Sequence, residues 1–211
     1  MTEQKQEGVT QYQCQLDVVD LHWPEPLLNE LNAWRGKLLT AGWVGQNPQR
    51  YSGLGFGNLS LRQPSPQYPE AFLITASQTG HLGWLNSKAW PWVVDASFSA
   101  NWVKAKGCQP PSSEALSHAA LYQANPNIQA VVHIHAPELW QAACRLEALS
   151  IPQSITYGST AMAQAIYTQG QANSGLLVML GHQDGLLAWG GSLEEACEYF
   201  YALQAKLRQQ Q

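Results

Sequence analysis

The stretch Ala130-Val-Val-His-Ile-His-Ala136 constrains the fold more than any other part of the sequence. Its apolar residues are β-branched or small, which is typical of a buried β-strand. Because side chains two residues apart point to the same face of a strand, His133 and His135 should stand side by side while Ile134 packs on the opposite face. Two buried imidazoles cost free energy unless core hydrogen bonds or a divalent metal ion satisfy their nitrogens. The pattern alone leaves both interpretations open.

The composition is that of a globular protein with few charges. Of the 211 residues, 45% are hydrophobic and 12% are charged, against a usual charged share of about 25%. A chain of this length and composition predicts one domain with a substantial core. The net charge is −4 and no lysine or arginine cluster occurs, which argues against nucleic acid or an anionic membrane as a partner. An anionic ligand would therefore be held by neutral donors.

Targeting and membrane signals are not evident in the sequence. The start of the chain up to Thr10 is polar and lacks the apolar stretch of a signal peptide. No run approaches the roughly 18 apolar residues needed to span a bilayer. The cysteines are scattered and form no C-x-x-C pair, as expected for reduced thiols in a cytoplasmic protein; they are Cys14, Cys108, Cys144 and Cys197.

Hydrophobic periodicity predicts strands that alternate with helices. Helices are expected over residues 24–39, 112–122, 137–149, 159–167 and 192–208. The second helix should have Ser112 or Ser113 as its N-cap, and the last should begin with a capping box of Ser192 and Glu195. Apolar runs predict strands at 11–20, from 58 onward, and at 71–75, 92–95, 102–106, 130–136, 175–180 and 186–189, with a loop beginning at Ile151. The fold class is therefore an α/β sandwich, with helices on both faces of a largely antiparallel sheet.

Polar loops at the ends of these strands are candidates for ligand binding. Thr79 and Gly80 follow the strand at 71–75, where α/β proteins often place ligand donors. The glycine-rich run before Asn58 lets a backbone approach a ligand closely, although an ordinary tight turn explains it equally well. Glu114 lies at the start of a helix, where free N–H groups can bind an anion.

His182 strengthens the metal interpretation of the histidine strand. It follows the apolar strand at 175–180, between Gly181 and Gly185, so its side chain can be displayed with little crowding. A third histidine from a different strand end completes a three-ligand site with an open coordination position. That arrangement is typical of catalytic zinc, whereas structural zinc is more often bound by several cysteines.

Taken in order, these motifs resemble the class II aldolase/adducin-head family. The resemblance rests on Gly57-Asn58-Leu-Ser60, Thr79-Gly80, Ser112-Ser113-Glu114-x-x-x-His118-x-x-x-Tyr122, His133-x-His135 and Gly181-His182-x-x-Gly185, and runs from roughly residue 24 to 205. It implies an αβα sandwich that spans residues 1–211 as a single domain. Residues 1–23 would then be an N-terminal extension, and 209–211 a short tail.

The resemblance also implies roles for individual residues. It makes His133, His135 and His182 the ligands of one Zn²⁺ per chain, with Glu114 as the catalytic group beside the metal. The substrate pocket, which binds phosphate in the family, maps onto Gly57, Asn58, Thr79, Gly80, Ser112 and Ser113. The implied activity is that of a lyase that cleaves or forms a carbon–carbon bond in a small sugar-like or sugar-phosphate-like substrate through a zinc-stabilised enediolate. The resemblance and the nine tryptophans together predict a homo-oligomer, expected to be a tetramer.

Other activities on the same fold remain alternatives. Sugar-phosphate epimerases of this family usually carry aspartate where Glu114 stands, and its dehydratases place a glutamate after the H-x-H, where residues 151–160 contain none. A non-catalytic adducin-like interaction module is a third alternative, although such modules lack a working metal site. His118 is expected to have a structural role or to contact the site residues rather than the substrate. Tyr157 is a candidate proton donor at a site completed by a neighbouring subunit.

Overall fold

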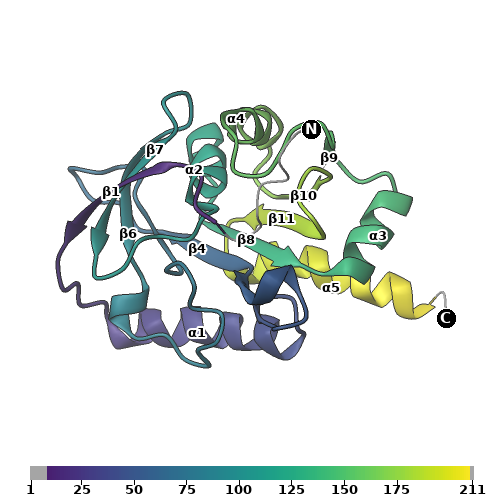
Figure 1. Ribbon diagram of the computed structural model, residues 1–211, viewed down its shortest axis with the longest axis horizontal. Coiled ribbons are helices and arrows are strands. Elements are labelled where there is room, and N and C mark those ends of the chain that lie inside the picture. The colour runs from purple at the N-terminus through teal and green to yellow at the C-terminus, as the bar shows by residue number, and fades with distance from the viewer. Residues whose placement is uncertain (1–8, 210–211) are drawn as a thin grey trace.

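A nine-stranded sheet with helices on both faces forms the protein, as the computed structural model shows (Figure 1). The structure describes residues 9–209. The prediction of a signal-free polar start therefore lies largely outside the described residues, as does most of the predicted tail. The strands of the sheet are β1 (Gln13–Val18), β4 (Asn58–Arg62), β5 (Phe72–Ile74), β6 (Trp92–Ser97), β7 (Trp102–Gly107), β8 (Ala130–His135), β9 (Ser150–Ile151), β10 (Gly175–Met179) and β11 (Gly185–Gly190).

Most neighbouring strands run antiparallel, which confirms the predicted fold class. The strand order is β1-β7-β6-β5-β4-β8-β11-β10-β9, and the β1/β7 and β10/β9 pairs are the parallel ones in this sheet. The histidine strand β8 lies in the interior of the sheet between β4 and β11. Its register pairs His133 with Asn58 on one side, and pairs His135 with Gly185 on the other. Pairing thus collects residues from distant parts of the sequence at one end of β8.

The helices divide between the two faces of the sheet. Helices α1 (Glu25–Thr40), α3 (Pro137–Arg145) and α5 (Leu193–Gln209) cover one face, and α2 (Ala115–Ala124) and α4 (Thr160–Gln169) cover the other (Figure 1). Ile134 belongs to the core under α1, α3 and α5, whereas Val131 packs on the α2 side. Because His133 and His135 alternate with Ile134, they share the face of Val131. The predicted alternation along the histidine strand is confirmed.

Several predicted boundaries were wrong, each for a local reason. Helix α3 ends at Arg145 rather than 149, because Glu147 has a left-handed φ of 52°. Ile151, predicted as the start of a loop, instead belongs to β9, which pairs with β10. The N-cap of α2 is Glu114 rather than a serine. In α5, Ser192 Oγ accepts from the Glu195 N–H as predicted, but the Glu195 carboxylate accepts from Gly191 rather than from Ser192.

Two smaller elements lie beside the site. Strands β2 (Gly45–Gln46) and β3 (Gly55–Phe56) form a separate hairpin, whose tip includes the 3₁₀ turn Tyr51–Gly53. A second 3₁₀ turn covers Ser87–Ala89. The four cysteines are free thiols, and none of the helices in residues 9–209 has the length and apolar character to cross a membrane.

Candidate metal centre and its pocket

Three buried histidines meet at the end of the central strand. His133 and His135 come from β8, and His182 comes from the turn between β10 and β11; each is at most 3% exposed. One ring nitrogen from each residue lies within 4.8 Å of the others, and in the described part of the chain this is the one such group of potential ligands. The Nε2 atoms of His133 and His135 are 3.0 Å apart. The structure therefore brings together the three residues predicted to bind the metal.

Two glycines make room for this cluster. A Cβ atom on Gly185 would stand 3.1 Å from His182 Cγ and 3.3 Å from His133 Cε1, closer than most side chains tolerate. A Cβ atom on Gly181 would come within 1.9 Å of the Ile155 carbonyl oxygen, so only glycine fits there. The G-H-x-x-G motif at residues 181–185 therefore has a steric basis. Side chains at its two glycine positions would prevent the turn from packing His182 against β8.

The protonation of these imidazoles suits metal binding. His133 Nδ1 lies 3.0 Å from the Leu186 carbonyl oxygen, which can only accept, so Nδ1 carries the proton and Nε2 keeps its lone pair. Burial, followed by repulsion from His182, lowers the pKa of both His133 and His135 well below the ordinary value. Neutral imidazoles are the form that binds a metal.

The spacing of the His133 and His135 Nε2 atoms is close to that of metal ligands. Lone pairs of two neutral Nε2 atoms at 3.0 Å repel each other unless a proton or a cation lies between them. Ligands around a tetrahedral Zn²⁺ at about 2.0–2.1 Å would lie roughly 3.3 Å from one another. The donor set therefore fits a divalent ion.

Glu114 places a carboxylate beside the three imidazoles. It is the N-cap of α2 and is 2% exposed. Its Oε1 lies 3.9 Å from His182 Nδ1, and its Oε2 accepts a 2.6 Å hydrogen bond from Ser117 Oγ. The serine, one turn further along the helix, thereby orients the carboxylate so that the other oxygen faces the histidines.

All ten predicted site residues line one pocket. The pocket encloses about 490 Å³, including its open mouth, and its walls contain the three histidines and Glu114 together with Gly57, Asn58, Thr79, Gly80, Ser112 and Ser113. Gly57 has a left-handed φ of 71°, and a Cβ atom there would lie 2.5 Å from Val44 Cγ1. A Cβ atom on Gly80 would lie 2.1 Å from the Gly45 carbonyl oxygen. Glycine at position 80 lets the 79–80 loop close against the hairpin, and glycine at position 57 lets the chain after β3 pass close to Val44.

The pocket also contains residues to which sequence reasoning gave no role, notably Tyr51. Its ring lies 4.7 Å from that of His135, and its hydroxyl accepts from Arg50 Nη2 at 2.6 Å and donates to Asp184 Oδ2 at 3.0 Å. Arg50 also donates to the His135 carbonyl oxygen at 3.0 Å. Burial raises the pKa of Tyr51 to about 12. The glycine-rich run that begins at Tyr51 marked this loop, but no local pattern indicates that it folds onto β8.

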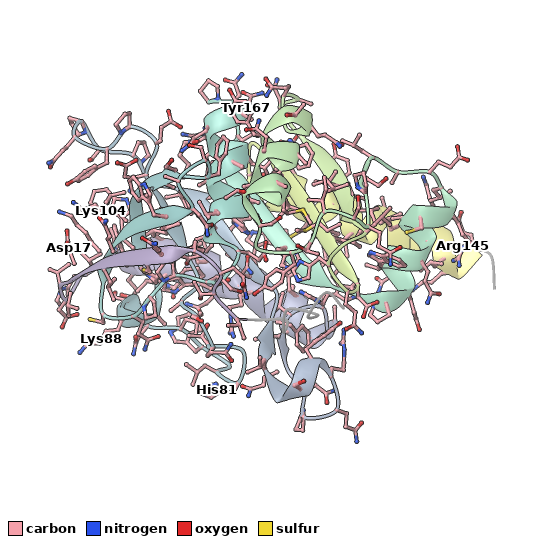
Figure 2. All side chains as sticks on the ribbon, turned by 45° about the horizontal axis from the view of Figure 1, so that its top comes forward. Asp17, His81, Lys88, Lys104, Arg145 and Tyr167 are labelled. Atoms are coloured by element: carbon pink, nitrogen blue, oxygen red, sulfur yellow. The ribbon has the colours of Figure 1, made fainter. Side chains whose placement is uncertain are left out.

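Other histidines and Tyr157 lie around the site rather than in it. His118 is fully buried, with Nδ1 2.7 Å from Ser60 Oγ, and burial lowers its pKa to about 3. His81 is exposed at the edge of the molecule and does not line the pocket (Figure 2). The ring of Tyr157 packs 4.6 Å from that of His182, and its hydroxyl donates to the Val9 carbonyl oxygen. The hydroxyl of Tyr157 is thus directed at the N-terminal segment.

Solved structures with the same fold come from several bacteria. YgbL from Klebsiella pneumoniae, for which an aldolase, epimerase or decarboxylase activity has been suggested but not established, is 22% identical, with a TM-score of 0.63 over 88% of this chain and 89% of its own. An L-fuculose-1-phosphate aldolase from Thermus thermophilus is 17% identical, with a TM-score of 0.60 over 89% and 95%. A sugar-phosphate aldolase from Thermotoga maritima is 16% identical, with a TM-score of 0.62 over 85% and 91%.

These likenesses are to the fold, because the identities are low. A comparison with curated protein sequences finds no match. A match to a family, in contrast, extends over most of the sequence. The family described as Class II Aldolase and Adducin N-terminal domain matches residues 48–211, which include all ten residues predicted for the site. The chain therefore belongs to the class II aldolase and adducin N-terminal domain family.

Proposed function

We propose that this protein is a metal-dependent lyase that cleaves or forms a carbon–carbon bond in a small hydroxy-carbonyl compound. The observation that carries the proposal is the position of Glu114. A buried carboxylate, held by Ser117, lies 3.9 Å from one of three clustered histidines and faces the same pocket. A metal site that served structure alone has no need of a carboxylate aimed into an open pocket.

His133, His135 and His182 would hold the ion, one per chain. Three neutral imidazoles leave an open coordination position, and this donor set suits Zn²⁺. When bound, a divalent ion supplies Lewis acidity, which stabilises negative charge as it develops on the oxygens of a substrate carbonyl and the adjacent hydroxyl. The hydrogen bond from His133 Nδ1 to the Leu186 carbonyl holds that ring in the orientation a ligand needs.

Glu114 would move the proton of the reaction. In the bond-forming direction, Oε1 takes a proton from the carbon beside the carbonyl, and the electron pair of that C–H bond forms the new bond to the carbon of an aldehyde. The C=O π pair of the aldehyde moves to its oxygen, which takes a proton from water and becomes the new hydroxyl. In the cleaving direction that hydroxyl loses its proton to water as the aldehyde C=O forms and the carbon–carbon bond breaks, and the Glu114 carboxyl gives its proton to the carbon that receives the electron pair. Because Ser117 Oγ occupies Oε2, the proton is carried by the oxygen nearer the histidines.

The rest of the pocket would bind and orient the substrate. Asn58 is 6% exposed, and its Oδ1 has no hydrogen-bond partner in the described part of the chain, so a substrate hydroxyl can donate to it. Ser112, Ser113 and the 79–80 loop provide further polar groups around the mouth. A polar, open pocket of this kind suits a small hydroxylated compound better than an apolar one.

The test combines metal analysis with a search for the reaction. Protein purified without an affinity tag is assayed for metal content and for aldehyde release from phosphorylated and free hydroxy-ketones and hydroxy-acids. We expect about one Zn²⁺ per chain and aldehyde release, both lost in His133→Ala. Protein that neither contains nor takes up Zn²⁺ would refute the proposal. Isomer formation without aldehyde would instead identify an epimerase, and loss of water would identify a dehydratase.

A further inference from the structure

The backbone of His135 is held on one side by residues 43–50, which lead into the β2/β3 hairpin and form part of it. The His135 N–H donates to the Trp43 carbonyl oxygen at 2.9 Å, and the His135 carbonyl oxygen accepts from Arg50 Nη2 at 3.0 Å. On its other side, His135 pairs with Gly185 of β11. The end of β8 is therefore fixed between the hairpin and the turn that carries His182.

Tyr51 at the tip of the hairpin connects these two segments. Its hydroxyl accepts from Arg50 Nη2 at 2.6 Å and donates to Asp184 Oδ2 at 3.0 Å. The direction of both bonds is fixed, because a guanidinium can only donate and a carboxylate can only accept. In the described part of the chain no direct ion pair joins Arg50 to Asp184, so the hydroxyl is the link between the two charges. Asp184 follows His182 by two positions, so the link reaches a second histidine of the cluster.

The ring of Tyr51 also contacts the imidazole of His135. The two ring centres are 4.7 Å apart at an angle of 63°, and the ring of Phe56 lies 5.9 Å from the same imidazole. The guanidinium of Arg50 lies 4.8 Å from the Tyr51 ring and 4.6 Å from the Phe56 ring, where a cation stabilises both. An imidazole packed in this way has little freedom to rotate, so its nitrogens keep their direction in the cluster.

The backbone of the hairpin tip is strained where it presents Tyr51. Tyr51 and Ser52 have left-handed φ angles of 49° and 57°, which residues other than glycine rarely adopt. Such conformations persist only where surrounding contacts outweigh their cost, and they are concentrated at functional sites. The contacts of Tyr51 are those with Arg50, Asp184 and His135. The conformation of the tip therefore brings the Tyr51 side chain against the candidate metal centre.

We propose that Tyr51 is a positioning residue of the metal centre, which locks His135 and the turn of His182 in the geometry that binds the ion. The inference rests on the proposed function for the presence of a metal, but no catalysed reaction is needed to test it. Groups that orient metal ligands from behind usually contribute roughly tenfold to a hundredfold to metal affinity. Tyr51→Phe, which removes the hydroxyl and keeps the ring, should therefore weaken Zn²⁺ binding by a factor in that range.

Two other roles for Tyr51 would give different results. A hydroxyl that only stabilised the hairpin would lower the melting temperature of the metal-free protein and leave Zn²⁺ affinity unchanged. A hydroxyl that only contacted the substrate in the pocket would change KM and leave Zn²⁺ affinity unchanged. Tyr199→Phe is the matched control. Tyr199 is also partly buried, and its hydroxyl donates to Ser174 Oγ at 3.1 Å, but it does not line the pocket.

The experiment is competition for Zn²⁺ between each protein and a chelator, with the melting temperature of each metal-free protein measured in parallel. We expect Tyr51→Phe to bind Zn²⁺ roughly tenfold to a hundredfold more weakly than wild type. Tyr199→Phe should bind Zn²⁺ like wild type. The two metal-free variants should melt at similar temperatures, because both keep their aromatic ring and lose only the hydrogen bonds of a hydroxyl.

A double variant tests whether the hydroxyl acts through Asp184. Asp184→Asn keeps a side-chain oxygen and tolerates the left-handed φ of 56° at that position, but it loses the charge. We expect it to weaken Zn²⁺ binding less than Tyr51→Phe does. The affinity of Tyr51→Phe/Asp184→Asn should equal that of Tyr51→Phe, because the hydroxyl that joins the two groups is already absent.

Three results would overturn the inference. These are wild-type Zn²⁺ affinity in Tyr51→Phe, an equal loss of affinity in Tyr199→Phe, and losses in the two single variants that multiply in the double variant. The lyase proposal fails separately. If Zn²⁺ affinity depends on Tyr51 but no hydroxy-carbonyl compound is cleaved, the positioning role stands and the lyase does not. If aldehyde is released and Tyr51→Phe binds Zn²⁺ like wild type, the lyase stands and the positioning role does not.

Discussion

Replacing Glu114 by glutamine separates catalysis from metal binding at this site. The substitution keeps the size and shape of the side chain but removes the group that can accept a proton. All three histidines keep their neighbours, so the Zn²⁺ content should stay near one per chain. If Glu114 moves the proton of the reaction, kcat should fall by roughly 10²–10⁴-fold, the usual effect of losing a general acid–base.

The structure limits how much of that loss could come from unfolding. The 2.6 Å bond from Ser117 to a carboxylate would become a bond to a neutral amide, at a cost of about 1 kcal/mol. The loss of a buried charge partly offsets this cost. In a chain of this size a change of about 1 kcal/mol shifts the melting temperature by roughly 2–4 °C. A 10²–10⁴-fold loss of kcat corresponds to about 3–5 kcal/mol in the barrier, well above the stability change.

The assay measures turnover, Zn²⁺ content and melting temperature on the same samples. Glu138→Gln is the matched control, because Glu138 lies in the first turn of α3 and is exposed. It should lose only the helix-dipole interaction, about 0.3–1 kcal/mol, and keep full activity. A Glu114→Gln protein that turns over like wild type would falsify the assignment of Glu114 as the proton-transfer group. Loss of Zn²⁺ in that variant would instead show that the carboxylate supports the metal.

Three further predictions follow from the same structure. Gly185→Ala should push on the rings of His182 and His133 and weaken Zn²⁺ binding by about tenfold or more, whereas Gly83→Ala, with open space around it, should not; Zn²⁺ titration against a chelator measures both. His118 has its pKa lowered to about 3 from 6.5, so the folded state excludes a proton that the unfolded state binds between these values. The stability contributed by this group is complete above about pH 6.5, and it falls by about 1.4 kcal/mol per pH unit below that value. When the free energy of unfolding is measured by urea at several pH values, its fall per pH unit should be smaller by that amount in His118→Gln than in wild type. Light scattering should show a homo-oligomer, expected to be a tetramer, and a monomer at micromolar concentration would contradict this expectation.

Local sequence patterns determined much of this protein because they arise from the backbone repeat. The period of two along β8 was sufficient to place His133 and His135 on one face with Ile134 on the other, and the structure has them so. Sequence patterns identified the five α-helices of residues 9–209, and the amphipathic ones did so because an apolar stripe must face the core wherever the helix lies. Helix ends were less certain, because the end of α3 depends on the pairing of β9 with β10. The motifs that carried the family resemblance were sufficient to name ten residues that line one pocket.

Tertiary structure alone decided how those residues meet. The pairing of β11 with β8 brings Gly185 opposite His135 and carries His182 to the cluster, although the two histidines are 47 positions apart in the sequence. Tyr51 reaches Asp184 across 133 positions, Arg50 reaches the His135 carbonyl across 85, and Arg35 reaches Leu82 across 47. No hydrophobic periodicity in the sequence indicates such contacts, because they depend on strand order and loop closure rather than on the backbone repeat within one helix or strand. The three histidines of the candidate metal centre could therefore be named from the sequence, whereas a contact such as that of Arg35 with the Leu82 carbonyl became visible only in the folded chain.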